Sequence, residues 1–328
     1  MRESDEERVL AELGEDWVLS KILNSLSRVE GSRLQVGDDA VEIPVKGPVI
    51  VSGDMLVSST DVPPGMTLRQ AGSKAIVSVV SDFAAKGAQP LYFIIELGLP
   101  KMMRGAEFLE LWSGILDAAR LYGGEVIAGD TNQANEIIVG VVGVGYSEAP
   151  IPRDRARPGD IIAVTGLFGK TATGLHATFN SNFDTRWQPL LDSVYNPKPR
   201  LKEGIALGRA RLATASIDSS DGLESCLYEI SRWSKVSLEV TDPPIDPLAK
   251  EYAATYDIDL VEAVFRGGEE YELVLTIPRD RFDEAANLLE KMGSNLIPIG
   301  RVTEGKSISV KIYGKTYHLS GRGWRHFR

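Results

Sequence analysis

Aspartate residues beside small residues recur along the chain, in the segments VGDDAV, VIVSGDML, VVSDFAAKGA, VIAGDTN and SIDSSDGL. None of them has an adjacent Lys or Arg to neutralise its charge. Carboxylates that gather in a fold require a cation, and Mg²⁺ takes carboxylate oxygens while keeping positions for water and substrate phosphates. The pattern therefore predicts several magnesium ions that hold the phosphates of a nucleotide. The candidate ligands are Asp38, Asp39, Asp54, Asp82, Asp130, Asp218 and Asp221.

Each of these aspartates, taken alone, also has a structural explanation, because Asp is a favoured turn and N-cap residue. Asp221, followed by Gly222 and a helical pattern, is the clearest possible cap. Recurrence at five strand or helix ends favours the metal hypothesis. Glycines in SGDM, AGDTN, RGGEE and SDGL would let the backbone approach a ligand, and exposed amides bind phosphate oxygens. Glycine pairs are also ordinary turn residues.

The segment from Gly166 to Thr171, GLFGKT, resembles the end of a phosphate-binding P-loop, which has four residues between its glycines. Only two stand there in this sequence, so the loop that wraps the phosphates is missing. We interpret the segment as a strand-to-helix turn in which Lys170 remains able to contact phosphate.

Other chemistries have few candidate residues. The histidines His176, His318 and His326 have no zinc-binding spacing, and no GxSxG serine motif occurs. Ser219 and Ser220 are better suited to hydroxyl or amide contacts than to nucleophilic attack. The single cysteine, Cys226, excludes an internal disulfide, fits a reducing cytoplasm and is expected to be buried as a small apolar residue.

The composition is that of a globular protein, with 43% hydrophobic and 25% charged residues. A net charge of −10 argues against nucleic acid as a partner, because its phosphates are bound by clustered Lys and Arg. The acidic start lacks the pattern of a signal peptide, and no apolar run approaches the roughly 20 residues of a membrane-spanning helix. The expectation is a soluble, cytoplasmic protein with no membrane partner.

The elements that must position these residues alternate between strands and helices. The first half should hold a helix within residues 1–30, with Val18, Ile22, Leu23 and Leu26 on one side. The runs VEIPV and PVIVS should form a hairpin around Lys46-Gly47-Pro48. Further helices are expected at 67–87 and 105–122, each ending at glycine, with strands at 91–100, 125–130 and 136–147.

At 328 residues the chain exceeds the usual size of one core, so two domains are expected. Turn-forming and charged residues from Ala149 onward mark the boundary, which gives domains 1–148 and 149–328. In the second domain, strands are expected near 160–166, 213–218 and 270–277, and helices near 169–179, 222–234 and 282–293. Short strands should close the chain.

Taken together, the motifs GDDA, SGDMLV, SDFAAKGA, AGDTN, TGLFGKTATGL, IDSSDGL, GGEEYEL and GWRHF resemble one superfamily. It contains thiamine-monophosphate kinases, aminoimidazole ribonucleotide synthetases, selenophosphate synthetases and a hydrogenase-maturation dehydratase. The resemblance runs from Gly37 to Phe327 and is strongest to the thiamine-monophosphate kinases. It implies an α+β fold of two domains with mixed sheets and helices packed on them. It also implies a homodimer formed through the N-terminal sheets, and ATP bound with several Mg²⁺ ions.

The implied reaction is direct transfer of the γ-phosphoryl group of ATP to thiamine monophosphate, with positioning and electrostatics supplying the rate. Asp130 and Asp221 would be catalytic, and the terminal Trp324 could alternatively pin the tail to the core. The implied metal ligands are Asp39, Asp54, Asp82, Asp130, Asp218 and Asp221, with Asp38 adjacent. ATP would contact Ser52, Gly53, Gly129, Asp130, Arg153 and Ser220, and the substrate would contact Asp61, Glu269 and Trp324.

The chain departs from the family at Asp61, which stands where bacterial members have a substrate-contacting His. Two alternatives remain open: a purine-ring-closing synthetase of the same superfamily, and a nucleotide-binding regulator without turnover. Against the regulator stands the full set of aspartates, because unused clustered carboxylates repel one another. The selenium and hydrogenase branches use terminal cysteines, whereas Cys226 is internal.

Overall fold

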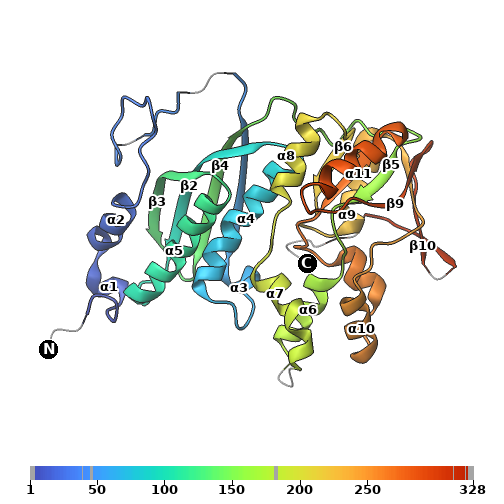
Figure 1. Cartoon of the computed structure of the whole chain (residues 1–328). Helices are drawn as coiled ribbons and strands as arrows, with labels where there is room; N and C mark the ends of the chain where they lie inside the picture. The colour runs from blue at the N-terminus through green and yellow to red at the C-terminus, as the bar shows by residue number, and fades with distance from the viewer. Residues whose placement is uncertain are drawn as a thin grey trace. The chain divides into compact units, whose positions relative to one another are not determined.

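The computed structural model describes residues 4–38, 40–44, 47–180, 184–312, 314–321 and 323. The chain forms two compact units, each with its own sheet (Figure 1). Unit 1 comprises residues 1–80 and 89–146, and unit 2 comprises residues 81–88 and 147–328. Helix α4, Leu68–Lys86, contributes its first part to unit 1 and its last residues to unit 2.

The sheet of unit 1 is mixed, with strand order β1-β4-β2-β3. Strands β1 and β2 both pair antiparallel to β4, whereas β2 and β3 run parallel. The strands are β1 Ile50–Val57, β2 Gln89–Leu99, β3 Glu125–Gln133 and β4 Ile138–Tyr146.

Helices α4 and α5, Gly105–Leu121, lie on one face of this sheet (Figure 1). The two helices cross closely at Gly114. A Cβ there would lie 2.0 Å from the Arg69 carbonyl oxygen, so only glycine fits. On one face of the strands Leu56 is buried, whereas the alternating residues Val51 and Met55 are 59% and 61% exposed. One face of the sheet therefore forms the core, and the other carries exposed apolar side chains.

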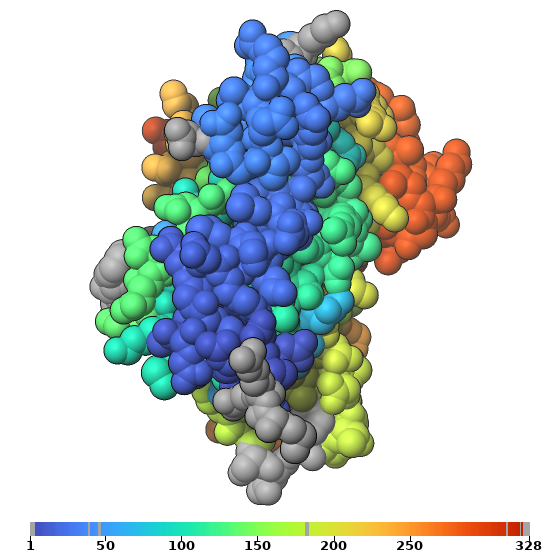
Figure 2. Space-filling view, turned by 90° about the vertical axis from the view of Figure 1, so that its left-hand side faces the viewer, coloured from blue at the N-terminus to red at the C-terminus, as the bar shows by residue number. Residues whose placement is uncertain are grey.

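The N-terminal segment covers the β3 side of unit 1. It contains α1, Leu10–Leu13, and α2, Glu15–Leu23, and the amide of Ser27 donates to the carbonyl oxygen of Val126 in β3 at 2.9 Å. The indole of Trp112 donates to the hydroxyl of Ser25 at 2.8 Å. Figure 2 shows this segment in the darkest blue, in the lower part of the face turned to the viewer.

Unit 2 contains a seven-stranded mixed sheet of order β11-β10-β7-β9-β5-β8-β6. Only β7 and β10 pair in parallel among the described strands of this sheet. The strands are β5 Ile161–Val164, β6 Ala215–Asp218, β7 Ser237–Val240, β8 Leu273–Ile277, β9 Ile297–Thr303, β10 Ile308–Ile312 and β11 Lys315–His318. The helices are α6 Lys170–Thr178, α7 Gln188–Tyr195, α8 Leu201–Arg209, α9 Leu223–Ser234, α10 Pro247–Thr255 and α11 Phe282–Glu290.

Most predicted elements are confirmed, including α4, α5 and the mixed sheets. The predicted hairpin is wrong, because residues 41–44 form no strand and β1 instead pairs with β4, far along the chain. Asp54 and Asp130 lie inside β1 and β3 rather than at their ends. In α2, Ile22 is buried as expected, whereas Leu23 is 42% exposed. No helix among the described residues is long and apolar enough to cross a membrane.

Candidate active site

Two of the predicted ligands, Asp82 and Asp218, come together in unit 2. Asp218 ends the buried strand β6, and its Oδ2 accepts a hydrogen bond from the hydroxyl of Ser81 at 2.8 Å. Burial, and then the charge of Asp82, raises the pKa of Asp218 to about 7. A buried carboxylate beside a second one is costly unless a cation or a proton neutralises it. This pair is therefore a candidate for neutralisation by a cation.

A lysine lies close to this pair. The ammonium of Lys86 donates to the carbonyl oxygen of Ser216 at 2.8 Å. Burial, and then the charge of Arg153, lowers the pKa of Lys86 to about 8, although Asp218 and Asp82 act in the opposite direction. No Lys or Arg is adjacent to these aspartates in sequence, but the fold brings Lys86 close to two of them. The signal was present, because Lys86 follows Asp82 by one turn of α4.

Two predicted loops lie side by side in unit 2, SSDG after β6 and GGEEY before β8. The amide of Glu269 donates to the carbonyl oxygen of Ser220 at 2.8 Å, and the amide of Tyr271 donates to that of Ser219 at 2.9 Å. A Cβ at Gly268 would lie 2.5 Å from the Ser220 carbonyl oxygen, so the contact requires glycine. Glu269 and Tyr271 have φ of 62° and 53°, a strained conformation that is concentrated at functional sites.

This arrangement places three predicted residues together. Ser220 and Asp221 are exposed on the first loop, and Glu269 is half-buried on the second. Arg153, the other predicted phosphate contact of unit 2, has its guanidinium 3.9 Å from the carboxylate of Glu229 in α9.

The two predicted metal ligands Asp54 and Asp130, both among the described residues of unit 1, do not meet within that unit. Asp54 and Asp130 lie on the outer strands β1 and β3, with two strands between them, a separation of roughly 14 Å at about 4.8 Å per strand. Each carboxylate is exposed and accepts the amide of the next residue, Met55 at 2.7 Å and Thr131 at 2.8 Å. At this distance the two carboxylates do not coordinate one and the same ion.

Sequence reasoning missed a second carboxylate next to Asp130. Glu96 of β2 is its Cα partner in the parallel β2–β3 pair, so both side chains lie on the same face of the sheet. Both are exposed. The strand predicted at 91–100 is confirmed, and a glutamate within its apolar run was the available signal. The backbones of β2 and β3 also approach closely at Gly129, because a Cβ there would lie 2.0 Å from the Ile95 carbonyl oxygen.

The remaining predicted residues of unit 1 have simpler surroundings. Asp61 ends the short helix α3, Ser58–Asp61, and its Oδ2 accepts the amide of Val57 at 2.6 Å. Ser52 and Gly53 lie in β1 beside Asp54, and Asp38 is exposed in a loop. Asp39 and Trp324 lie outside the described residues.

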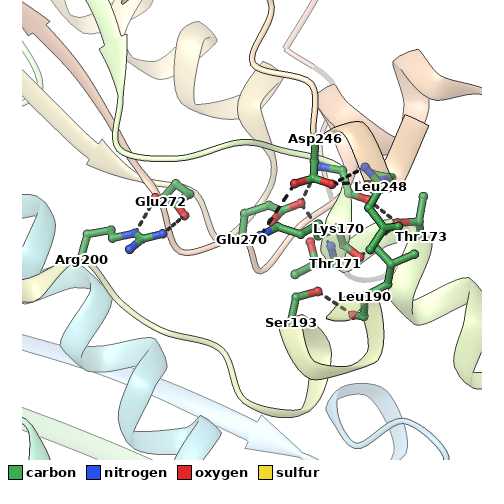
Figure 3. Close-up of polar contacts among 12 residues, drawn as sticks. Lys170, Thr171, Thr173, Leu190, Ser193, Arg200, Asp246, Leu248, Glu270 and Glu272 are labelled. Atoms are coloured by element: carbon green, nitrogen blue, oxygen red, sulfur yellow. Dashed lines mark hydrogen bonds and ion pairs between the residues drawn. The ribbon is translucent and has the colours of Figure 1, made fainter. Parts of the chain in front are cut away.

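The segment that resembles a P-loop has its amides occupied by a carboxylate (Figure 3). The amides of Gly169 and Thr171, at the start of α6, donate to Oε1 of Glu270 at 2.6 and 3.2 Å. Burial raises the pKa of Glu270 to about 7. The ammonium of Lys170 is 3.9 Å from Asp246. The segment connects β5 to α6, as predicted, and these amides are satisfied within the protein.

The oxygen atoms that the acidic residues offer as metal ligands are suited to Mg²⁺. Within the described residues, no group of three or more His, Cys, Asp or Glu side chains gathers at one point. The pairs Asp82–Asp218 and Glu96–Asp130 supply only oxygen, which Mg²⁺ prefers, and leave other positions to water and phosphate. The arrangement suits ions that are shared with a ligand rather than ions enclosed by protein.

Comparison with known proteins agrees with this geometry. The model of the N-terminal domain of AIR synthase related proteins matches residues 37–147, and that of their C-terminal domain matches residues 157–313. The two units and the acidic site thus define a protein of the AIR synthase related class. A thiamine-monophosphate kinase of Nitrosopumilus maritimus is 35% identical, with 94% of this chain and 98% of that protein covered. One from Pyrococcus horikoshii is 35% identical, with 89% and 91% covered.

A solved structure is similar over almost the whole chain. It is described as AaThiL complexed with AMPPCP and TMP, with a TM-score of 0.77, 27% identity, and 98% of this chain and 99% of that chain covered. The chain belongs to the thiamine-monophosphate kinase family.

Proposed function

We propose that this chain transfers the γ-phosphoryl group of ATP directly to thiamine monophosphate, giving thiamine diphosphate and ADP. The observation that carries the proposal is the similarity, over 98% of the chain, to a structure that holds both AMPPCP and TMP. AMPPCP is an analogue of ATP, so that protein binds a donor and an acceptor of the same types. The thiamine-monophosphate kinases that are 35% identical to this chain support the same reaction.

The chain's own residues would act by binding and orienting the two substrates. Asp82, Asp218 and Asp221 from unit 2, and Asp39, Asp54 and Asp130 from unit 1, would hold Mg²⁺. The bound ions would offset the charge on the transferred phosphoryl group and its leaving oxygen. Asp130 and Asp221, both exposed, are the proposed catalytic residues.

Other residues would orient the phosphates of ATP. Ser220 offers a hydroxyl on the exposed loop after β6, and Arg153 offers a guanidinium close to Lys86. Ser52, Gly53 and Gly129 would bring backbone close to the nucleotide. An oxygen of the acceptor phosphate then attacks the γ-phosphorus as the bond to the ADP oxygen breaks, with no covalent intermediate on the protein.

Carboxylates suit the acceptor because the thiazolium ring of thiamine is cationic. Glu269 lies half-buried beside Ser220 and Asp221, and Asp61 supplies a second carboxylate. Opposite charge favours binding in a partly dehydrated site. This is a physical reason for Asp61 at the position where bacterial members of the family have His. Trp324 would stack on the acceptor.

We further propose that the N-terminal domain, 1–148, carries the dimer contact as well as ATP and metal ligands, and that 149–328 completes the site. The exposed apolar residues Val51 and Met55 on the open face of the unit 1 sheet support a homodimer. The proposed location is the cytoplasm, where ATP is available.

The test is a choice between acceptors. Purified protein is incubated with ATP and Mg²⁺, and with either thiamine monophosphate or formylglycinamidine ribonucleotide, and the products are separated by chromatography. Thiamine diphosphate in the first reaction and no ring-closed product in the second are expected. The reverse result would assign the chain to the purine-ring-closing branch, and neither product would favour a regulator.

A further inference from the structure

A fully buried carboxylate near the proposed site has no role in the mechanism above. Glu224, the second residue of α9, is 0% exposed. Its Oε2 accepts a hydrogen bond from Nε of Arg266 at 2.9 Å, and its Oε1 accepts the amide of Ser320 at 3.0 Å. A buried charge is tolerated only when it is paired and hydrogen-bonded. Glu224 therefore ties two segments that are far apart in sequence to the first turn of α9.

The first of these segments is the C-terminal end of the described chain, which lies flat on α9. Gly321 has φ of +81°, and a Cβ there would lie 2.5 Å from Cγ of Tyr228. A Cβ at Gly323 would lie 2.5 Å from the carbonyl oxygen of Asp221. Only glycine allows both approaches. The segment thus passes directly over Asp221, a proposed metal ligand.

The second segment is the loop that carries Glu269. Arg266 immediately precedes Gly267 and Gly268, and the amide of Glu269 donates to the carbonyl oxygen of Ser220 at 2.8 Å. The ion pair between the buried Glu224 and the partly exposed Arg266 therefore holds two groups in place. These are the Glu269 loop and the C-terminal segment, which continues into Trp324. Both are assigned to the acceptor by the proposed function.

We propose that Glu224 and Arg266 are positioning residues for the acceptor. They hold the C-terminal segment and the Glu269 loop against the Asp221 loop, and they set the affinity for thiamine monophosphate without contacting it. The inference rests on the proposed function, because that function assigns Glu269 and Trp324 to the acceptor.

Gly321→Ala tests the packing of the C-terminal segment, with Gly314→Ala as the matched control. Both glycines have positive φ, +81° and +79°, but a Cβ at Gly314 would meet nothing within 4 Å. The alanine at 321 should raise the KM for thiamine monophosphate about tenfold, equal to about 1.4 kcal/mol of lost binding. The KM for ATP and kcat should stay within about twofold of wild type. The control should leave all three values unchanged.

Glu224→Gln tests the ion pair itself. The glutamine has one acceptor oxygen for two donors, so either Arg266 or the amide of Ser320 faces an NH₂ group. Hydrogen exchange of the peptide that contains Ser320 should become faster, and the KM for thiamine monophosphate should rise as in Gly321→Ala. Faster exchange with an unchanged KM would overturn the positioning role, and unchanged exchange would overturn the docking.

Hydrogen exchange needs no turnover, so it tests the docking of the C-terminal segment independently of the proposed reaction. Wild-type protein that forms no thiamine diphosphate would overturn the proposed function, and with it the acceptor role of this segment. The exchange result would still decide whether Glu224 holds the segment on α9. A general loss of stability is distinguished from positioning, because a smaller folded fraction would lower the apparent kcat and leave both KM values unchanged.

Discussion

Replacing Asp218 by asparagine should make the protein more stable at neutral pH when no divalent ion is present. Burial and the neighbouring Asp82 raise the pKa of Asp218 from 3.8 to about 7. The folded state therefore binds the proton more tightly than the unfolded state, and stability falls as the pH rises from about 4 to about 7. At 1.36 kcal/mol per pH unit, the ionised carboxylate costs at most about 4 kcal/mol above pH 7.

Asparagine removes this charge with little change in shape, and its carbonyl oxygen can accept the hydroxyl of Ser81 as Oδ2 of Asp218 does now. In EDTA at pH 8 the variant should gain up to about 4 kcal/mol of unfolding free energy. At pH 5 the gain should shrink to less than half of this, because folded wild type is then protonated at this site. Urea denaturation at both pH values measures the difference.

Magnesium should reverse the order. If Asp218 is a ligand, Mg²⁺ at about 100 times its dissociation constant should stabilise wild type by about 2.7 kcal/mol and the variant by much less. Glu270→Gln is the matched control: burial also raises the pKa of Glu270 to about 7, but this carboxylate accepts hydrogen bonds from the α6 turn and is not a proposed metal ligand. Relative to wild type, the Glu270→Gln variant should become more stable as the pH rises, yet it should keep the wild-type response to Mg²⁺. An Asp218→Asn protein that is less stable than wild type at pH 8 in EDTA would refute the reasoning.

Three further outcomes are expected. Trp324→Ala should raise the KM for thiamine monophosphate in steady-state assays, and an unchanged KM would leave Trp324 a structural role. Met55→Glu should turn a two-chain assembly into a monomer in light scattering, whereas a monomeric wild type would contradict the proposed dimer. Gly204→Ala should lower the free energy of unfolding by about 1–3 kcal/mol. The added Cβ would lie 1.9 Å from the Ala84 carbonyl oxygen, which outweighs the usual helix gain of about 1 kcal/mol; a more stable variant would show that α8 can move away.

Local signals in the sequence were enough to predict the long helices α4 and α5. Helix α4 ends at Lys86, before Gly87 with φ of +60°, and α5 ends shortly before Gly123 with φ of +82°. Glycine tolerates these conformations, so both helix ends could be predicted from composition. The hairpin around Gly47 could not be rejected in the same way. The competing partner of β1 is β4, and a pairing between distant strands leaves no local pattern.

The site was predictable in residue type but not in grouping. Asp82 and Asp218 carry the same small-residue pattern as Asp54, yet only the fold shows which of them meet. Lys86 and Glu96 were missed for a related reason. Their importance comes from a neighbour on another element, Asp218 for the lysine and Asp130 for the glutamate. Spacing within a single element gave only a weak indication of either contact.

The most direct test of the account follows the γ-phosphoryl group of radiolabelled ATP in wild type and in Asp130→Asn. With thiamine monophosphate and Mg²⁺, wild type should place the label in thiamine diphosphate, and EDTA should abolish the transfer. Asp130 is exposed and bonds only to the next amide among the hydrogen bonds described above, so the variant should fold normally but transfer no label at any Mg²⁺ concentration. Transfer at the wild-type rate by Asp130→Asn would contradict the claim that these carboxylates hold the ions used in phosphoryl transfer.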